Sequence, residues 1–275
     1  MSGQHSAAGP DSYEPVAGLY DLFAAARGKE ALPDAAGFAQ AARPGDRVLD
    51  IGAGSGRVAL AVAAAGASVW CVEPSPAMRS VLLGKLAASP GLWPRVTVLA
   101  GRAPRFDAGR PPGRPGSFDY ATLAGVLQFL TPAERPVLFR TVARYLRPGG
   151  LLALDMVADT PLPDTRQRPG ERTGETRAAT ATVGDTTYAL YAAEETVSAR
   201  HSRIHYRLTT HERPEGTAAR SADHTFVRDH HTHLLQEVVH DLAECGFAQE
   251  LVPPAAPGLA AVRTFRRNHG LYGRE

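Results

Sequence analysis

Short apolar runs alternate with longer amphipathic stretches between about residue 44 and residue 157. The apolar runs have the length of buried strands, whereas the stretches between them have helical length and spacing. The predicted strands are 47–51, 68–73, 95–101, 118–124 and 151–157, and the predicted helices are 55–65, 75–89 and 131–146. Ser75 and Thr131 stand at N-cap positions, and a proline follows each of them. This alternation predicts parallel strands joined by right-handed crossovers.

The pattern changes after residue 158. The runs that follow are dense in Thr, Val, Tyr and Ala, and Gly184-Asp185 between two of them is a two-residue hairpin signal. We therefore predict an antiparallel sheet of three or four strands over 176–227. A helix over 231–247 and an antiparallel hairpin made of "AQELVP" and "AAVRTFRR" are predicted to close the chain.

These patterns divide the chain into four parts. Residues 1–12 are small and polar and are predicted to be disordered. Residues 13–43 are predicted to form a helical cover. Residues 44–157 and 228–275 then form the α/β domain, and 158–227 form an inserted antiparallel lid. Such a lid would roof the open edge of the sheet where ligands bind in folds of this type.

Length, charge and cysteine content exclude several classes of protein. A chain of 275 residues can form one large domain with an inserted subdomain. The net charge is +2 and the basic residues are scattered, so we expect no nucleic-acid partner. Cys71 and Cys245 lie far apart in sequence, which favours a reducing cytoplasm over a disulfide framework. No signal peptide and no membrane span are expected, because the required apolar segments are missing.

The segment "RVLDIGAGSGRVAL", residues 47–60, joins the first predicted strand to the first predicted helix. Its three glycines are Gly52, Gly54 and Gly56. A dinucleotide fingerprint needs its third glycine where this chain has Arg57. Asp50, two residues before the first glycine, would repel a diphosphate but suits a ligand that carries an ammonium group. S-adenosylmethionine has an amino group, a sulfonium and no phosphate, so the loop favours this cofactor.

Glu73 stands at the end of the second predicted strand, 23 residues after Asp50. Because adjacent parallel strands end at the same edge, its carboxylate is expected beside the glycine loop, where it can accept bonds from ribose hydroxyls. Nicotinamide and S-adenosylmethionine sites both use such an acid. Glu73 therefore supports a nucleoside site without separating the two cofactors.

Four segments resemble the successive motifs of class I S-adenosylmethionine-dependent methyltransferases. They are "VLDIGAGSG", "VEPSPAM", "FDYATLAGVLQFL" and "YLRPGGLLALD", within about residues 45–157. The resemblance implies a doubly wound, Rossmann-like sheet of seven strands in the order 3-2-1-4-5-7-6, mostly parallel, with strand 7 antiparallel. It also implies S-adenosylmethionine as cofactor and S-adenosylhomocysteine as product.

The resemblance further implies which residues bind the cofactor. Asp50 would lie near the ammonium group, Glu73 would hold the ribose, and Pro74 and Met78 would flank the adenine. Arg102 stands where many relatives have an aspartate that reaches the adenine amino group. The remaining implied contacts are Gly52, Ala53, Gly54 and Gly56 along the methionyl side, the backbone of Arg102 and Ala103, and Leu123.

Residues 13–31 resemble the N-terminal cover of small-molecule N-methyltransferases of the glycine and amino-sugar type. The resemblance implies that Tyr20 approaches the sulfonium and that Arg27 pairs with the methionyl carboxylate. Relatives often have an aromatic residue where this chain has Ala31. The alternative is an amphipathic helix with core tyrosines, because the large apolar residues of the segment have helical spacing.

Methyl transfer needs positioned reactants and a water-poor cavity, and a hydroxyl acceptor also needs a base or a metal. No metal is expected, since the fourth predicted strand ends in Leu-Ala-Gly where metal-dependent O-methyltransferases carry acids. His224 and His231 are assigned as catalytic together with Tyr20, and Gln128 is assigned to the substrate. His230 and His233 remain further base candidates.

The favoured hypothesis is an S-adenosylmethionine-dependent methyltransferase acting on N or O of a small natural-product metabolite. The rivals are non-methylating chemistry at the same cofactor site, namely cyclisation or decarboxylation, and a non-catalytic partner subunit. A nicotinamide oxidoreductase ranks last. The insert carries aromatic and basic residues that would line either the pocket or a homodimer contact, namely Tyr188, Tyr191, His205, Tyr206 and Arg207.

Overall fold

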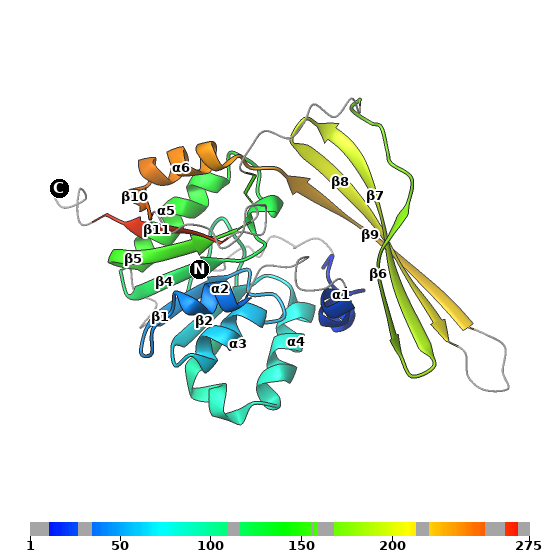
Figure 1. The fold of residues 1–275 in the computed structure, drawn as a ribbon, viewed down its shortest axis with the longest axis horizontal. Helices are drawn as coiled ribbons and strands as arrows, with labels where there is room; N and C mark the ends of the chain where they lie inside the picture. Colours follow the sequence, from blue (N-terminus) through cyan, green and yellow to red (C-terminus); the bar gives the residue numbers. More distant parts are fainter. Residues whose placement is uncertain are drawn as a thin grey trace, which may run out of the picture.

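The computed structural model describes residues 11–26, 35–108, 116–155, 157–158, 168–212, 220–250 and 262–268. These residues form a seven-stranded sheet in the order β10-β11-β5-β4-β1-β2-β3 and a four-stranded sheet in the order β6-β7-β8-β9. Figure 1 shows helices above and below the larger sheet, with the smaller sheet standing beside it as a long curved wall.

The larger sheet has the predicted topology. Its strands are β1 (Arg47–Ile51), β2 (Ser68–Glu73), β3 (Val96–Ala100), β4 (Phe118–Leu123), β5 (Leu146–Leu154), β10 (Phe247–Gln249) and β11 (Arg263–Arg267). Strands β1 to β5 pair in parallel, and β11 runs antiparallel to both β5 and β10. With β10 and β11 in the sixth and seventh places of the chain order, the order 3-2-1-4-5-7-6 is confirmed.

Successive strand residues face two different layers of helices. Leu49 and Ile51 of β1 pack in the apolar cluster that contains Phe139, whereas Val48 packs in the cluster that contains Phe38. The helical segments are η1 (Ala17–Leu19), α1 (Tyr20–Ala26), α2 (Ala35–Gln40), α3 (Arg57–Ala64), α4 (Pro76–Ala87), η3 (Pro90–Arg95), η4 (Leu127–Phe129), α5 (Arg135–Tyr145) and α6 (Leu235–Glu244). Ser75 caps α4 as predicted, because its Oγ accepts the Met78 N–H at 3.0 Å.

Two predicted boundaries were wrong. The fifth strand begins at Leu146, where it pairs with Phe118, and the preceding helix begins only at Arg135. The helix predicted from residue 231 begins at Leu235, because β9 (Arg220–His231) stays paired with β8 (His201–Glu212) to its last residue. In the second case, antiparallel pairing overrides the helical spacing of the local sequence.

The smaller sheet is the predicted lid. It consists of β6 (Thr176–Val183), β7 (Thr186–Ser198), β8 and β9, and Val183 pairs with Thr186 across the predicted Gly-Asp turn. Tyr188 and Tyr206 lie on the face whose Leu190 and Leu208 pack against Val16 and Phe23 of the N-terminal segment. Tyr191, His205 and Arg207 lie on the opposite face, where Arg207 stacks on Tyr191 and binds Glu175.

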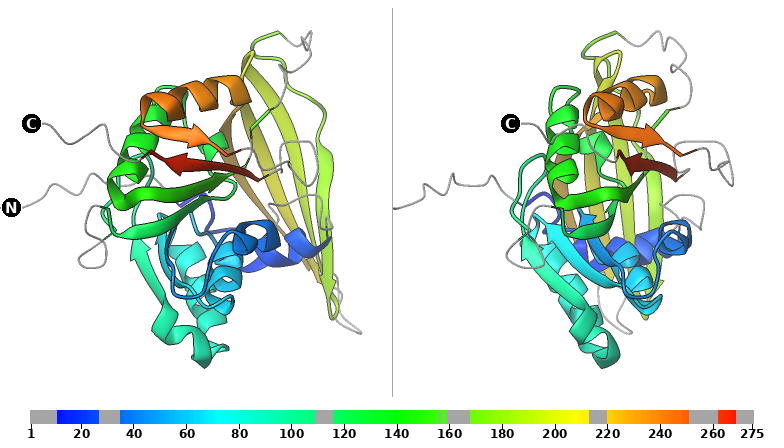
Figure 2. Two further views of the ribbon diagram at one scale, coloured as in Figure 1. Left: turned by 60° about the vertical axis from the view of Figure 1, so that its left-hand side comes forward. Right: turned by 90° about the vertical axis from the view of Figure 1, so that its left-hand side faces the viewer.

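Residues 11–26, here called the cover, connect the lid to the larger sheet. Helix α1 lies against β6 and η1 lies against α4, an arrangement visible from two sides in Figure 2. The disorder predicted for residues 1–12 concerns mainly residues 1–10, which are outside the described residues, whereas Asp11 and Ser12 are placed. Within the described ranges, no helix combines the length and the apolar character that a membrane span needs.

Candidate active site

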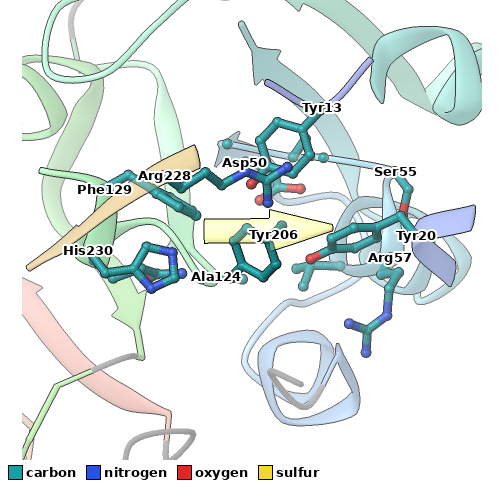
Figure 3. Close-up of a pocket in the computed structure, with 16 residues that line it drawn as sticks. Tyr13, Tyr20, Asp50, Ser55, Arg57, Ala124, Phe129, Tyr206, Arg228 and His230 are labelled. Carbon is teal, nitrogen blue, oxygen red and sulfur yellow. The ribbon is translucent and has the colours of Figure 1, made fainter. Parts of the chain in front are cut away.

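Two adjoining cavities, here together called the chamber, lie where β1, β2, β3 and β4 end. Both are lined by Tyr13, Tyr20, Gly52, Gly54, Ala124, Gly125, Phe129 and Arg228. The loop cavity also reaches Asp50, Gln128, Tyr206 and His230, whereas the strand-two cavity also reaches Glu73, Pro74, Met78, Arg102 and Ala103. Figure 3 looks into the loop cavity, with His230 and Phe129 at one end and Tyr20 and Arg57 at the other.

The glycine loop uses its backbone donors inside the protein. The N–H groups of Gly52 and Ala53 donate to the Val72 carbonyl at 2.7 and 3.3 Å, and the Gly54 N–H donates to Glu73 Oε2 at 2.8 Å. Gly54 adopts φ +57° and lines both cavities, so a side chain there would be strained. A phosphate needs free N–H groups at such a loop. These donors are instead committed to a carbonyl and a carboxylate, which disfavours a dinucleotide.

Asp50 presents a buried, incompletely bonded carboxylate to the chamber. The side chain is 1% exposed, and its Oδ1 accepts a hydrogen bond from Thr122 Oγ1 at 2.6 Å. Oδ2 is buried and has no hydrogen-bond partner among the described residues. Burial, assisted by the charge of Glu73, raises the pKa of Asp50 to about 6, against the bond from Thr122 and a weaker contribution from the Ala59 backbone N–H. An ammonium group of a ligand would satisfy the unpaired oxygen.

Glu73 is held at the end of β2 by two backbone donors. Its Oε1 accepts the Ser75 N–H and its Oε2 accepts the Gly54 N–H, both at 2.8 Å. Burial raises the pKa of Glu73, although the two backbone bonds and Arg79 act in the opposite direction. Each carboxylate oxygen keeps acceptor capacity, and the strand-two cavity lies beside it. This geometry suits a pair of ribose hydroxyls.

Among the described residues, most of those predicted to bind the cofactor line the chamber, and two do not. Gly56 lies outside both cavities, and a Cβ there would lie 2.2 Å from Leu82 Cδ1, so this glycine lets α3 and α4 pack closely. Leu123 is fully buried in the core below the chamber. Arg27 lies outside the described residues. The lining positions at the end of β4 are Ala124 and Gly125.

A second buried acid supports the end of β4. Asp155 is fully buried, and its Oδ1 accepts the Gly125 N–H at 2.7 Å. Its Oδ2 has no hydrogen-bond partner among the described residues, and burial raises the pKa of Asp155 to about 7. Because Gly125 lines both cavities, Asp155 fixes part of the chamber wall from behind.

The histidine at the chamber is His230. Its Nε2 is buried and has no hydrogen-bond partner among the described residues, and its ring meets Phe129 edge to face at 5.2 Å. Burial and the charge of Arg228 lower its pKa, which keeps the ring neutral near pH 7. Gln128 lies nearby with its Oε1 buried and also without a partner among the described residues. These two groups offer hydrogen bonds to a molecule in the chamber.

The two histidines assigned as catalytic from the sequence do not line the chamber. His224 is exposed six residues earlier on β9, and His231 stacks on His201 at 4.3 Å. The sequence analysis ended the antiparallel sheet at residue 227 and began a helix at residue 231, which hid the face that His230 shares with Arg228. With β9 extended to His231, the two-residue period of a strand groups His230 with Arg228 on one face.

His233 fixes the segment that carries Gln128 and Phe129. This histidine is fully buried, its Nδ1 lies 2.9 Å from Arg135 NH1, and its Nε2 lies 2.8 Å from the Leu127 carbonyl and 3.0 Å from the Leu130 carbonyl. The carbonyls and the guanidinium assign Nε2 as donor and Nδ1 as acceptor. His233 is therefore a structural residue of the chamber wall.

The cover is fastened to the larger domain at two points. Asp11 Oδ2 accepts a bond from Ser75 Oγ at 2.7 Å, beside the strand-two cavity. Asp21 accepts a bond from Ser55 Oγ at 2.8 Å and pairs with Lys85 at 2.6 Å, beside the glycine loop. Tyr13 and Tyr20 of the cover thereby form part of the chamber wall. No group of three or more metal-ligating side chains occurs among the residues that the structure describes.

Residues 48–150 match the family of methyltransferase domains. The chain is 36% identical over 151 residues to the release factor glutamine methyltransferase of Gloeobacter violaceus, covering 47% of this chain and 52% of the relative. The chain therefore spans about half the length of this curated relative.

Two solved structures share the fold over nearly the whole chain. The sugar N-methyltransferase KedS8 from Streptoalloteichus sp. has a TM-score of 0.69 at 21% identity, covering 98% of this chain and 99% of its own. CalS10, an amino pentose methyltransferase from Micromonospora echinaspora, has a TM-score of 0.63 at 23% identity, covering 91% of this chain and 97% of its own. Both likenesses extend to the lid as well as the larger sheet.

Proposed function

The chain carries a methyltransferase domain over residues 48–150, and from this premise we propose that it transfers a methyl group from S-adenosylmethionine to a small metabolite. The observation that carries the proposal is the buried Asp50 carboxylate, whose Oδ2 has no hydrogen-bond partner among the described residues. It lies beside a glycine loop in which the N–H groups of Gly52, Ala53 and Gly54 bond within the protein. That combination suits a ligand with an ammonium group and no phosphate.

The chamber residues fit the cofactor from end to end. Asp50 would hold the ammonium group, Glu73 the ribose hydroxyls, and Pro74 and Met78 the adenine, with the backbone of Arg102 and Ala103 at its edge. Gly54 leaves the space that the cofactor needs between the two cavities. When bound, S-adenosylmethionine supplies a methyl group on a positively charged sulfur.

The lid side of the chamber would receive the acceptor. Tyr20, Phe129 and Tyr206 enclose the loop cavity and exclude water from the reacting atoms. A new bond forms between the acceptor nitrogen or oxygen and the methyl carbon as the carbon–sulfur bond breaks. We assign His230 Nε2 to receive the proton that the acceptor's N–H or O–H group loses, because it is neutral, buried and without a hydrogen-bond partner in the described part of the chain.

Small amino sugars are the first acceptors to test. Two proteins with the same overall fold, lid included, are a sugar N-methyltransferase and an amino pentose methyltransferase. A small natural-product metabolite is consistent with a lid of four strands beside a partly open chamber. The expected cytoplasmic location and a homodimer contact stay predictions.

The test begins with calorimetry of the purified chain against S-adenosylhomocysteine and NADH. We expect S-adenosylhomocysteine to bind and NADH not to bind; the opposite result would overturn the proposal. A panel of amino sugars and hydroxylated metabolites is then incubated with ¹³C-methyl S-adenosylmethionine and followed by mass spectrometry. Gain of the labelled methyl identifies the acceptor, whereas consumption of an acceptor without it would indicate cyclisation or decarboxylation.

A further inference from the structure

Arg228 is the feature of the chamber that the proposed roles leave unused. It lies on β9, lines both cavities, and reaches across to the face of Tyr13 (Figure 3). Its guanidinium carbon lies 3.7 Å from the Tyr13 ring centre and 4.9 Å from that of Phe226. Such stacking fixes the plane of the guanidinium and leaves its edge donors for hydrogen bonds.

The guanidinium has few hydrogen-bond partners. NH2 donates to the Ser12 carbonyl at 3.0 Å, and Nε is buried without a hydrogen-bond partner among the described residues. No carboxylate of the described residues forms an ion pair with it, although Asp11 is near enough to feel its charge. Asp11 itself is bonded to Ser75 Oγ at 2.7 Å and to the Tyr13 N–H at 3.0 Å. Arg228 is partly buried, and a buried Nε–H group without a partner among the described residues is costly unless a ligand or water completes its bonding.

We propose that Arg228 is the anion-binding residue of the chamber and takes a carboxylate or phosphate group of a bound ligand. Among the described residues, the chamber then has an unpaired carboxylate oxygen on Asp50 and an incompletely bonded guanidinium on Arg228, which match an ammonium group and an acid group of bound ligands. Planar N–H pairs of arginine suit carboxylate and phosphate oxygens.

Two molecules can supply this anion. One is the cofactor, through its methionyl carboxylate, and the other is the acceptor, through an acid group of its own. The first source rests on the proposed function, whereas the second does not depend on which cofactor binds. In either case the ligand would bond to the lid and to the larger sheet at once, so Arg228 would couple occupancy of the chamber to the position of β9.

The test measures binding, so it needs no acceptor. Calorimetry compares wild type, Arg228→Gln and Arg228→Lys with two probes, S-adenosylhomocysteine and its descarboxy analogue, which keeps the ammonium group. A third titration adds methyl phosphate, and a fourth acetate, to protein saturated with S-adenosylhomocysteine. Arg203→Gln is the matched control, because Arg203 also lies in the lid but pairs with Glu195 and Asp229 instead of lining the chamber.

If the cofactor supplies the anion, Arg228→Gln weakens S-adenosylhomocysteine about tenfold or more, the loss of a charge-assisted hydrogen bond. The descarboxy analogue should then bind both proteins equally, and Arg228→Lys should fall between them. If the acceptor supplies the anion, S-adenosylhomocysteine is unaffected, and methyl phosphate or acetate binds the saturated wild type but not the saturated Arg228→Gln protein. Arg203→Gln should match wild type in each titration.

The proposal is overturned if no probe distinguishes Arg228→Gln from wild type. It is also overturned if the variant weakens S-adenosylhomocysteine and its descarboxy analogue by the same factor, which would mean a structural role. If Arg228→Gln does not fold, the same titrations are made on wild type alone. The proposal is then refuted if wild type binds S-adenosylhomocysteine and its descarboxy analogue with equal affinity and binds neither methyl phosphate nor acetate. Wild type that fails to bind S-adenosylhomocysteine at all refutes the proposed function instead.

Discussion

The two ends of the chamber are built in different ways. The glycine-loop end takes its polar groups from one β–α–β stretch, in which Asp50 and Glu73 are buried acids at the ends of neighbouring strands. The lid end takes Tyr13, Gln128, Arg228 and His230 from three separate parts of the chain and carries a guanidinium and a neutral imidazole. The glycine-loop end, here called the acidic end, is therefore built from groups that are close in sequence. The lid end, here called the basic end, forms only once the lid and the cover have docked.

The largest effect should come from the lid end. We expect His230→Ala to lower the turnover of an identified acceptor about 100-fold, the usual contribution of a positioned base. Binding of S-adenosylhomocysteine should stay within twofold of wild type, because His230 is assigned to the acceptor and not to a cofactor contact. Single-turnover rates by mass spectrometry and calorimetry of the same preparations measure the two quantities.

His231→Ala is the matched control for this change. The neighbouring histidine stacks on His201 outside the chamber and should leave turnover unchanged. Wild-type turnover should decrease in acid, at a pH below the ordinary pKa of a histidine, since burial lowers the pKa of His230 and protonation removes the base. Added imidazole should partly restore His230→Ala. Equal rates for His230→Ala and wild type would remove this residue from the mechanism.

The next effect should come from the acidic end. Asp50→Ala is expected to weaken S-adenosylhomocysteine roughly 10- to 100-fold, the cost of losing a charge-assisted hydrogen bond to the ammonium group. The turnover of Asp50→Ala at saturating cofactor should decrease by a smaller factor than its affinity for S-adenosylhomocysteine. For His230→Ala we expect the reverse, a large loss of turnover with almost unchanged affinity. Calorimetry of Asp50→Ala beside Asp119→Ala, an acid that pairs with Arg147 away from the chamber, separates this loss from a general charge effect. Unchanged affinity in Asp50→Ala would contradict the assignment.

The pH dependence of binding should separate the two ends further. Because burial raises the pKa of Asp50 to about 6, its carboxylate is largely protonated at pH 5 and ionised at pH 7. A bound ammonium group stabilises the ionised form, so S-adenosylhomocysteine should bind roughly tenfold more tightly at pH 7 than at pH 5. Calorimetry across this range should show the increase in wild type and its loss in Asp50→Asn.

The stability of the ligand-free protein should change in the opposite direction. A carboxyl whose pKa is raised on folding favours the native state while it is protonated, so its contribution decreases as the pH rises from about 4 to about 6. Asp155, with its pKa raised to about 7, extends this decrease to higher pH. Thermal unfolding of Asp50→Asn should therefore show a smaller decrease between about pH 4 and pH 6, while the Asp155 contribution, which decreases from about pH 4 to about pH 7, remains.

The same division explains what the sequence could predict. The acidic end could be assigned because Asp50, Glu73 and Met78 lie in two consecutive motifs, and parallel pairing brings their strand ends together. The motifs did not distinguish ligand contacts from packing positions, since Gly56 and Leu123 belong to them yet do not line the chamber. At the basic end, the identity of the lining residues depends on where β9 ends, and pairing with β8 decides that point. Arg228 can be recognised as a chamber residue only after the face of β9 that carries it is known.

The smallest expected effect concerns the attachment of the cover to the acidic end. Asp21 of α1 binds Ser55 Oγ and Lys85 above the glycine loop, and all three are near the surface or shielded only by the cover. A partly exposed pair of this kind contributes about 1 kcal/mol or less. We therefore expect Asp21→Ala to speed the dissociation of S-adenosylhomocysteine about threefold, measured by stopped-flow displacement, with little change in the association rate.

Glu14→Ala removes an exposed acid of the same cover and should leave both rates unchanged. If both variants speed dissociation of S-adenosylhomocysteine equally, net charge and not the attachment at Ser55 governs the dissociation rate. If neither variant changes the rate, the basic end alone holds the chamber closed.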